Sequence, residues 1–195
     1  MPVARPLTLA DLAAPRSTAL TQLLLVVVAS LATAGAAQLE VRLPWTPVPI
    51  TGQTFAVLLS GAVLGARRAF LAQLLYLAEG AAGLPFFAGG AAGVARLVGP
   101  TGGYLIAFPF AAAITGLLAE RGWDRRPVTM FLAMLAGSTV IFGLGLAYLS
   151  DFVPKGALLA SGLYPFLAGD VLKSLLAAGL FPALWKLVAR FEGRA

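Results

Sequence analysis

The chain has 195 residues, of which 59% are hydrophobic and 11% are charged, and its mean hydropathy is +0.90. These values exclude an ordinary soluble domain and predict a single-domain, all-α integral membrane protein. The absence of cysteine and histidine excludes disulfides, thiolate or imidazole catalysis and most zinc or haem sites, so we expect no metal and no cofactor. We attribute the net charge of +6 to membrane topology rather than to nucleic-acid binding.

The N-terminal part of the chain predicts a short cytoplasmic lead and a first membrane span. The lead covers residues 1–19, and the span covers Leu20–Ala37. The end of this span has the small residues of a signal-peptidase site after an apolar stretch. Small residues at four-residue spacing also make a flat face, either for packing inside the bundle or for docking of a partner protein. These residues are Ala29, Ala32, Thr33, Ala36 and Ala37.

A proline-rich connection and two short helices follow. Gln38–Thr51, called the proline loop below, contains three prolines and is predicted to be extended, because prolines this close forbid a helix. Helices are expected over Gly52–Ala66 and from Ala69 to about Glu79, with Arg67 and Arg68 in a tight cytoplasmic turn between them. Both helices are shorter than the roughly 20 residues of a perpendicular span. They therefore either extend into their loops or form a partly re-entrant pair.

The next stretch, Gly80–Tyr104, is called the glycine-rich segment below because eight glycines precede its final tyrosine. Lipid cannot satisfy the free backbone groups of such an irregular segment, so it must pack against protein or line a cavity. Glycine also permits close approach to the backbone. We therefore predict that this segment forms half of a ligand site.

Three more spans complete the predicted membrane domain, which covers residues 20–190 and is followed by a tail at 191–195. The spans are Tyr104–Leu118, Val128–Leu149 and about Gly162–Val188, joined by the charged turn Glu120–Arg126 and the connection Asp151–Ser161. Six spans with both termini cytoplasmic place ten of the fourteen basic residues on the cytoplasmic side, as the positive-inside rule requires. Only Arg42, Arg96 and Lys155 then lie outside, with Lys173 in a span. This topology brings the proline loop, the glycine-rich segment and the Asp151–Ser161 connection together on the outer face.

Asp170 and Lys173 are the strongest candidates for a ligand site, because both lie within the sixth predicted span. A charge near the bilayer centre costs about 2.5–3.5 kcal/mol on insertion scales, so ionisable residues there usually face the bundle interior and have a function. Their i, i+3 spacing places them on one helix face. Together they offer an acceptor and a donor to a small molecule with N–H and carbonyl or carboxylate groups. The alternative is a structural ion pair that locks this helix to its neighbours.

Loop residues supply further candidates. The GPTGGY sequence at Gly99–Tyr104 opens a helix whose free N–H groups favour an anion, but no GxxxxGK[ST] motif occurs, so we expect no ATP hydrolysis by this chain. Arg96 either pairs with a carboxylate or marks an aqueous loop, and Glu79 is either a ligand contact or an interfacial acid. Thr51 and Gln53 are either ligand contacts or helix caps. The outer aromatic residues form either an interfacial belt or a pocket for a flat ring: Trp45, Phe55, Phe86, Phe87, Tyr104 and Tyr164.

Four ordered motifs carry a resemblance to a known family. They are VPITGQTFAVLLSGAVLG (Val48–Gly65), YLAEGAAGLPFFAGG (Tyr76–Gly90), GPTGGYLIAF (Gly99–Phe108) and GDVLKSLLA (Gly169–Ala177). Together they resemble BioY, the biotin-binding S component of energy-coupling factor (ECF) transporters, from about Ala19 to the last helix. The resemblance implies a six-helix S-component bundle in the plasma membrane of a prokaryote that captures biotin from the outer side. It also implies a transmembrane T component and two cytoplasmic ATPases as partners, although some relatives act without a dedicated module.

The resemblance assigns roles to individual residues. Asp170 and Lys173 match the acidic and basic positions of the family's last-helix motif and are expected to contact polar groups of biotin, with the ureido end preferred. The outer aromatics would enclose the bicycle, and Gly99–Tyr104 with Arg96 would receive the carboxylate. Arg96 lies outside the strongest motifs, and the LPFFAGG stretch that contains Phe87 departs from a commoner LPVFAGG. The expected biotin contacts are Asp170, Lys173, Arg96, Tyr104, Gln53, Thr51, Phe55, Glu79, Phe87 and Gly90, and the expected docking residues are Ala29, Ala32, Thr33 and Ala36.

Three other functions compete with this hypothesis. The chain could be an S component for another vitamin or small polar solute. It could be an intramembrane enzyme, but the lack of histidine, cysteine and a second acid partnered with Asp170 argues against that. It could also be a structural membrane subunit, in which Asp170 and Lys173 contribute only to stability.

Overall fold

The structure is a computed structural model that describes residues 8–13 and 18–191. The predicted lead falls partly outside these residues, and the predicted tail lies outside them except for Phe191. The elements in chain order are α1 (Leu9–Ala13), α2 (Ala19–Ala37), β1 (Glu40–Val41), β2 (Ile50–Thr51), α3 (Gln53–Leu64), α4 (Ala66–Ala81), η1 (Ala88–Gly90), η2 (Val94–Arg96), α5 (Gly102–Glu120), η3 (Trp123–Arg125), α6 (Pro127–Leu149), η4 (Lys155–Ala157), α7 (Leu158–Gly162) and α8 (Tyr164–Phe191).

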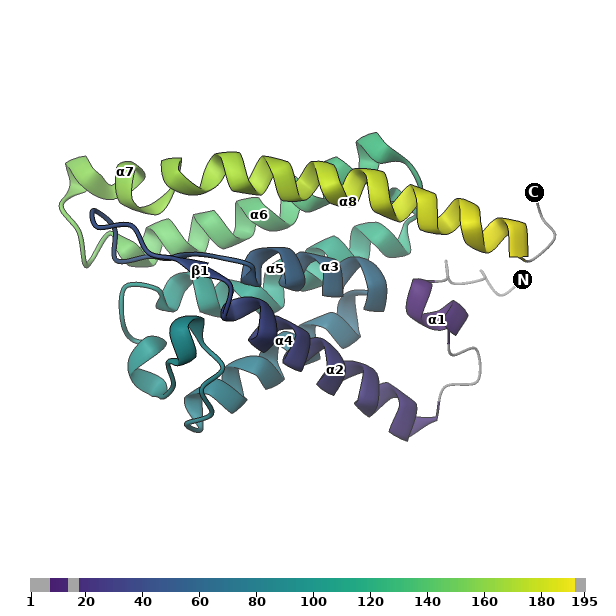
Figure 1. The fold of residues 1–195 in the computed structure, drawn as a ribbon, viewed down its shortest axis with the longest axis horizontal. Helices are drawn as coiled ribbons and strands as arrows, with labels where there is room; N and C mark the ends of the chain where they lie inside the picture. Colours follow the sequence, from purple (N-terminus) through teal and green to yellow (C-terminus); the bar gives the residue numbers. More distant parts are fainter. Residues whose placement is uncertain (1–7, 14–17, 192–195) are drawn as a thin grey trace.

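The described residues form a helical bundle around α5, which packs against α3, α4 and α6 and buries most of its residues. α8 lies along α6 on one side of the bundle, and α2 lies along α4 on the other (Figure 1). The β1–β2 hairpin, η1, η2 and α7 gather at one end, on the left in Figure 1, which we call the hairpin end. α2 begins and α8 ends at the opposite end.

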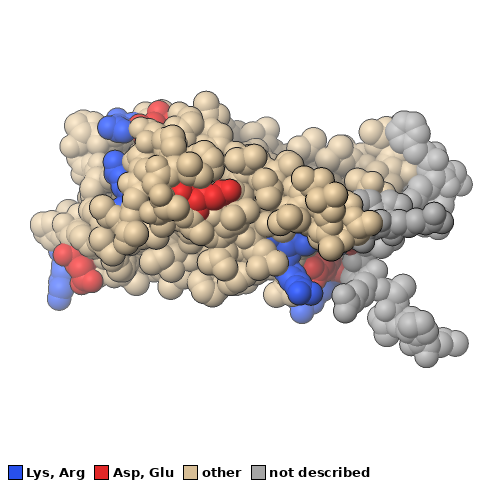
Figure 2. All heavy atoms as spheres, turned by 90° about the horizontal axis from the view of Figure 1, so that it is seen from below, with Lys and Arg blue, Asp and Glu red and all other residues tan. Residues whose placement is uncertain are grey.

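Among the described residues, four helical segments are long and apolar enough to cross a membrane: α2, α5, α6 and the stretch Lys155–Val188 that contains most of α8. α3 and α4, with 12 and 16 residues, are shorter than the roughly 20 residues of a perpendicular span. Figure 2 shows one face of the molecule covered mainly by uncharged side chains, with basic residues gathered toward its two ends. The all-α membrane class is thus supported, while six spans and the side of the termini stay predictions.

The turn between α3 and α4 differs from the prediction. Arg67 and Arg68 lie in the first turn of α4, and the chain reverses at Gly65, whose φ of 81° is in the left-handed region. Glycine tolerates this conformation, whereas arginine is a good helix former. Glu120, at the end of α5, accepts a hydrogen bond from the Ala66 N–H at 2.8 Å and caps α4. The turn is therefore formed by Gly65 and by the cap from Glu120, and not by Arg67 and Arg68.

Close packing of α5 against α3 and the start of α4 also depends on glycine. A Cβ at Gly61 on α3 would lie 2.4 Å from the carbonyl oxygen of Ala112 on α5, and a Cβ at Gly116 on α5 would lie 2.5 Å from the Ala66 nitrogen at the start of α4. Such contacts allow helix backbones to approach closely, as is common between membrane helices. α5 can therefore pack tightly against α3 and the start of α4.

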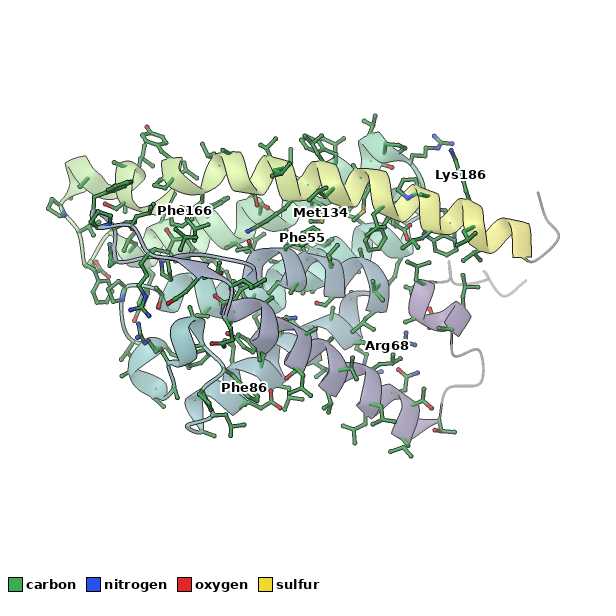
Figure 3. The ribbon with its side chains drawn as sticks, in the orientation of Figure 1. Phe55, Arg68, Phe86, Met134, Phe166 and Lys186 are labelled. Carbon is green, nitrogen blue, oxygen red and sulfur yellow. The ribbon has the colours of Figure 1, made fainter. Side chains whose placement is uncertain are left out.

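α1 is held against the bundle by an ion pair at the end opposite the hairpin. Arg68 points toward α1 (Figure 3), and its Nη2 lies 2.7 Å from Asp11 Oδ1. Burial alone would raise the pKa of Asp11, but hydrogen bonds from Thr8 and Arg68 outweigh burial, so the pKa lies below its ordinary value. The N-terminal lead therefore includes an ordered helix that is tied to α4.

Several other boundaries also differ from the predictions; for example, the helix predicted over Gly52–Ala66 covers Gln53–Leu64, and the span predicted over Tyr104–Leu118 covers Gly102–Glu120. The third predicted helix continues two residues further, to Ala81, and the Asp151–Ser161 connection contains η4 and most of α7. The last long helix begins at Tyr164, after a break at Leu163. No helix forms within the proline loop, as predicted, but its two ends pair as antiparallel strands, with Glu40 opposite Thr51. This pairing brings the two ends of the loop together at the start of α3.

Candidate functional site

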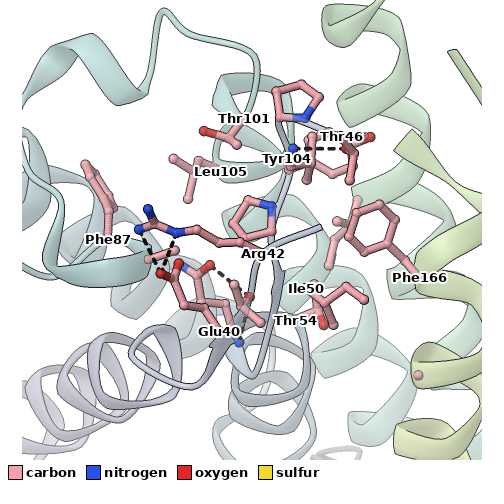
Figure 4. Close-up of a pocket in the computed structure, with 18 of the residues that line it drawn as sticks. Glu40, Arg42, Thr46, Ile50, Thr54, Phe87, Thr101, Tyr104, Leu105 and Phe166 are labelled. Carbon is pink, nitrogen blue, oxygen red and sulfur yellow. Dashed lines mark hydrogen bonds and ion pairs between the residues drawn. The ribbon is translucent and has the colours of Figure 1, made fainter. Parts of the chain in front are cut away.

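A cavity of about 270 Å³ lies at the hairpin end, roofed by the proline loop (Figure 4). Its walls come from the proline loop, the glycine-rich segment and four helices, so segments far apart in sequence build one site. The lining residues are Glu40, Arg42, Leu43, Thr46, Pro47, Val48, Pro49, Ile50, Thr51, Gln53, Thr54, Phe87, Ala88, Arg96, Thr101, Tyr104, Leu105, Phe108, Ile141, Phe142, Phe166, Gly169, Asp170 and Lys173.

The proline loop is held over the cavity by side-chain contacts at both ends. Near its tip, Thr46 Oγ1 donates to the Ser161 carbonyl at 2.6 Å and accepts from the Val48 N–H at 3.1 Å. At its base, the Thr51 carbonyl accepts from Lys173 Nζ at 2.8 Å. Prolines fix φ and lack an N–H, which explains why the loop forms no further strand and relies on these contacts.

Lys173 and Asp170 bind different neighbours instead of each other. Lys173 Nζ also donates to Thr54 Oγ1 at 3.0 Å, on α3. Asp170 is buried, and its Oδ1 accepts from Ser138 Oγ at 2.7 Å, on α6. No ion pair within 4.0 Å joins the two charged groups in the described structure. The alternative of a structural ion pair therefore takes another form, because each of the two residues ties α8 to a separate helix. Both residues still line the cavity.

Tyr104 connects the glycine-rich segment to the break before α8. It is buried in the first turn of α5, and its hydroxyl donates to the Gly162 carbonyl at 2.8 Å. A Cβ at Gly162 would lie 2.6 Å from that hydroxyl oxygen, so the contact needs glycine there. The same side chain forms part of the cavity wall. Tyr104 thus shapes the site and fixes where α7 ends.

Aromatic rings form much of the apolar wall. Phe87 is 2% exposed and packs edge-on against Tyr76, with ring centroids 5.6 Å apart. A Cβ at Gly80 would lie 2.3 Å from the Phe87 ring, so the glycine allows this ring to settle on α4. On the opposite wall, the rings of Phe142 and Phe166 lie 6.4 Å apart. These rings offer flat apolar surfaces to a ligand.

Thr51 and Gln53 act as structural residues and also line the cavity. Thr51 Oγ1 accepts the Gln53 N–H at 3.2 Å and donates to Gln53 Oε1 at 3.0 Å, while Gln53 Nε2 donates to the Tyr76 hydroxyl. Thr51 therefore supports the start of α3, although Gly52 is the N-cap residue. The capping and ligand-contact interpretations are compatible, since the cavity reaches both side chains.

Seven of the ten expected biotin contacts line the cavity, and three do not. The seven are Asp170, Lys173, Arg96, Tyr104, Gln53, Thr51 and Phe87. Phe55 packs against the core of the bundle instead. Glu79 accepts a hydrogen bond from Ser30 Oγ on α2, and the Gly90 N–H donates to Gln38 Oε1 at 3.0 Å. The structure therefore places these three residues in contacts within the protein, outside the cavity wall.

The sequence-based candidates missed several polar lining residues. Glu40 is in β1 and Arg42 directly follows that strand, and a spacing of two residues places side chains on one face of an extended chain. The sequence did not predict a strand here, so this rule could not be applied. Thr54 follows Gln53 in α3. The only feature of the sequence that could have indicated it is that a lysine within a span, Lys173, needs oxygen atoms to accept its hydrogen bonds. The remaining missed residues with polar or aromatic side chains are Thr46, Phe108, Phe142 and Phe166, whereas Thr101 belongs to the predicted Gly99–Tyr104 stretch.

The charges around the cavity match a ligand with one negative charge. Its lining includes three cationic side chains, Arg42, Arg96 and Lys173, and two carboxylates, Glu40 and Asp170. The lining therefore carries one net positive charge. No group of three or more histidine, cysteine, aspartate or glutamate residues able to hold a metal occurs in the part of the chain that is described. The arrangement suits binding of an organic monoanion with a polar head and an apolar middle.

The small residues of α2 separate into two faces. Thr33 and Ala37 are buried, and Thr33 Oγ1 accepts a hydrogen bond from Gln73 Nε2 at 3.1 Å, while Ala29 packs against the core. Ala32 is exposed and Ala36 is half-buried. The Ala29, Thr33 and Ala37 ladder therefore packs inside the bundle, and Ala32 lies on a face of α2 that the described bundle leaves exposed.

The comparisons with known proteins agree with this architecture. The BioY family model matches residues 9–190. A probable biotin transporter BioY from Pyrococcus horikoshii is 44% identical over 131 residues, which cover 67% of this chain and 76% of that protein. A biotin transporter BioY from Thermotoga maritima is 40% identical over 149 residues, covering 75% and 86%. The crystal structure of the S-component for biotin from an ECF-type ABC transporter superposes with a TM-score of 0.73 at 25% identity, covering 86% and 92%. The chain belongs to the BioY family.

Proposed function

We propose that this protein captures biotin at the outer face of a membrane and takes it up as the S component of an ECF transporter. The observation that carries the proposal is the cavity at the hairpin end, which joins Asp170 and Lys173 to the proline loop and the glycine-rich segment. It occurs in a chain whose relatives are named as biotin transporters and whose structural neighbour is a biotin S-component.

Biotin has three chemical parts, and the cavity offers a partner to each. The ureido ring needs acceptors and donors, which Asp170 and Lys173 supply beside Thr54. The apolar bicycle and tail fit between Phe87 on one wall and Phe166 on the other. The carboxylate balances the net positive charge of the lining. This order places the ureido ring toward α8.

The proposed topology has six spans and both termini in the cytoplasm, which places the hairpin end outside. α3 and α4 complete their spans with the flanking loops or remain shorter than the bilayer and sit beneath the proline loop. The basic residues at the opposite end support this orientation through the positive-inside rule, including Arg67, Arg68, Arg121 and Lys186. The membrane is the plasma membrane of a prokaryote.

Uptake requires the site to open toward the cytoplasm. We propose that the outer loops close over biotin, that the protein tilts on a transmembrane T component, and that two partner ATPases drive the opening. The exposed small-residue face of α2 around Ala32 serves as the docking surface for the T component. Only 17% of the apolar stretch of α2 is buried in the described bundle, which leaves this face of the helix available for docking.

Equilibrium binding to the purified protein tests the proposal against its nearest rival, an S component for another vitamin. Labelled biotin is titrated against the protein in detergent or nanodiscs, and unlabelled vitamins compete for the site. We expect biotin to bind one-to-one and other vitamins to compete only at much higher concentration. Tighter binding of a different vitamin would overturn the choice of ligand, and absence of any binding would favour a structural subunit.

A further inference from the structure

Arg42 and Glu40 form an ion pair in the wall of the cavity, at the point where the proline loop meets the glycine-rich segment. Both Nε and Nη2 of Arg42 lie 2.8 Å from a single carboxylate oxygen, Glu40 Oε1 (Figure 4). The other oxygen, Oε2, is buried and has no hydrogen-bond partner among the described residues. A guanidinium and a carboxylate bind most strongly when two N–H groups meet two oxygens. The pair therefore leaves part of its bonding capacity unused.

The glycine-rich segment holds this pair in place through Gly89. Its φ of 65° is in the left-handed region, and a Cβ there would lie 2.3 Å from Arg42 Nη2 and 2.6 Å from Glu40 Oε1. Only glycine leaves room for the guanidinium against the backbone. The position of Arg42 is thus set by two segments that both border the cavity.

Two guanidinium groups at the cavity have N–H donors that make no hydrogen bond within the described residues. Arg42 Nη1 makes no hydrogen bond with any described residue, and its side chain is 69% exposed. Arg96, on η2, is exposed and donates no side-chain hydrogen bond to the rest of the described chain. Arg42 belongs to the proline loop and Arg96 to the glycine-rich segment. One carboxylate held by both would connect the two segments.

We propose that Arg42, acting with Arg96, binds the carboxylate of the ligand, so that the ligand's negative charge connects the proline loop to the glycine-rich segment. The inference rests on the proposed function and names the residue that selects a free monocarboxylate over its amide. Glu40 is a positioning residue, because it orients the guanidinium through Nε and Nη2. The ligand carboxylate, which offers two oxygens, binds the donors that Glu40 leaves free on Arg42 and those of Arg96.

The test compares biotin with biotinamide, which keeps the ring and tail but lacks the charge. Arg42→Met should weaken biotin binding about tenfold, the lower range for a hydrogen bond to a charged group because Arg42 is exposed, and should leave biotinamide binding unchanged within about twofold. Lys155→Met, which removes a charge at the same end outside the cavity lining, should change neither. Equal losses for both ligands, or no loss for biotin, would overturn the inference. Failure of the wild type to bind biotin would instead refute the proposed function.

A second pair of variants tests the geometry without removing a charge. Gly89→Ala should displace the guanidinium and reduce the preference for biotin over biotinamide. Gly122→Ala is the matched control, because Gly122 also has a left-handed backbone (φ 82°, ψ 16°) but a Cβ there meets nothing closer than 3.6 Å. The control should keep the wild-type preference. Equal preferences in the two variants would show that Arg42 does not select the carboxylate.

Discussion

Lys173 offers the sharpest test of how the cavity is closed. Its ammonium donates to the Thr51 carbonyl at 2.8 Å and to Thr54 Oγ1 at 3.0 Å, so it ties the base of the proline loop and the start of α3 to α8. Lys173→Met keeps much of the apolar stem and removes both hydrogen bonds. We therefore expect the ligand site to lose order at the loop base while the bundle stays folded.

The magnitude follows from the two bonds. A hydrogen bond to a charged group contributes about 1.5–3 kcal/mol, and relief from burying the ammonium offsets part of this. A net loss of about 2 kcal/mol weakens biotin binding about thirtyfold, and a direct contact with the ureido group would increase the loss. Thr54→Val removes only the second bond and should weaken binding about fivefold, or about 1 kcal/mol.

Isothermal titration of the purified variants with biotin measures these losses, and thermal melting in the same detergent checks that the bundle is intact. The expected order of affinity is wild type, Thr54→Val and Lys173→Met. Wild-type affinity of Lys173→Met would refute the reasoning, because the cavity would then not need the contact between α8 and the proline loop.

Three further predictions address other parts of the molecule. Ala32→Trp on the exposed face of α2 should abolish biotin uptake in cells and leave binding intact, whereas Leu172→Trp on an exposed face of α8 should leave uptake unchanged; lost binding in the first variant would indicate internal packing. Gly61→Val should reduce the free energy of unfolding by about 1–3 kcal/mol through overpacking, because a Cβ there already meets a backbone oxygen at 2.4 Å, and this loss would be measured as a lower melting temperature. Asp11→Asn should reduce stability by about 0.5 kcal/mol near neutral pH. The folded pKa of Asp11 is lowered, so its stabilisation is present above the ordinary pKa and is lost as pH falls through the folded value; a wild-type-to-variant difference in melting that grows toward acid pH would contradict this sign.

The sequence located the site through residues that a bilayer penalises. Asp170 and Lys173 stood out because charges are rare within spans, and the glycine-rich segment stood out because lipid cannot satisfy irregular backbone. Both parts line the cavity in the structure. The all-α membrane class likewise followed from composition alone.

Other features depend on contacts between distant segments, which a single sequence does not display. The partners of Lys173 lie on the proline loop and α3, and the cap of α4 comes from Glu120 on α5. From the sequence, Arg42 contributes only to the count of basic residues on the outer side. The structure places it beside the cavity through the short pairing of Glu40 with Thr51. Glu79 is expected in the site because the predicted third helix ends there, next to the glycine-rich segment. In the structure, its carboxylate instead accepts a hydrogen bond from the Ser30 hydroxyl on α2.

Cysteine accessibility tests the central claim, that the cavity at the hairpin end is the biotin site. The chain has no cysteine, so Thr101→Cys in the cavity wall and Lys155→Cys outside it each give a single reactive thiol. We predict that saturating biotin slows maleimide labelling of the thiol at position 101 and leaves labelling at position 155 unchanged. Labelling at position 101 that proceeds at the same rate with and without bound biotin would contradict the account.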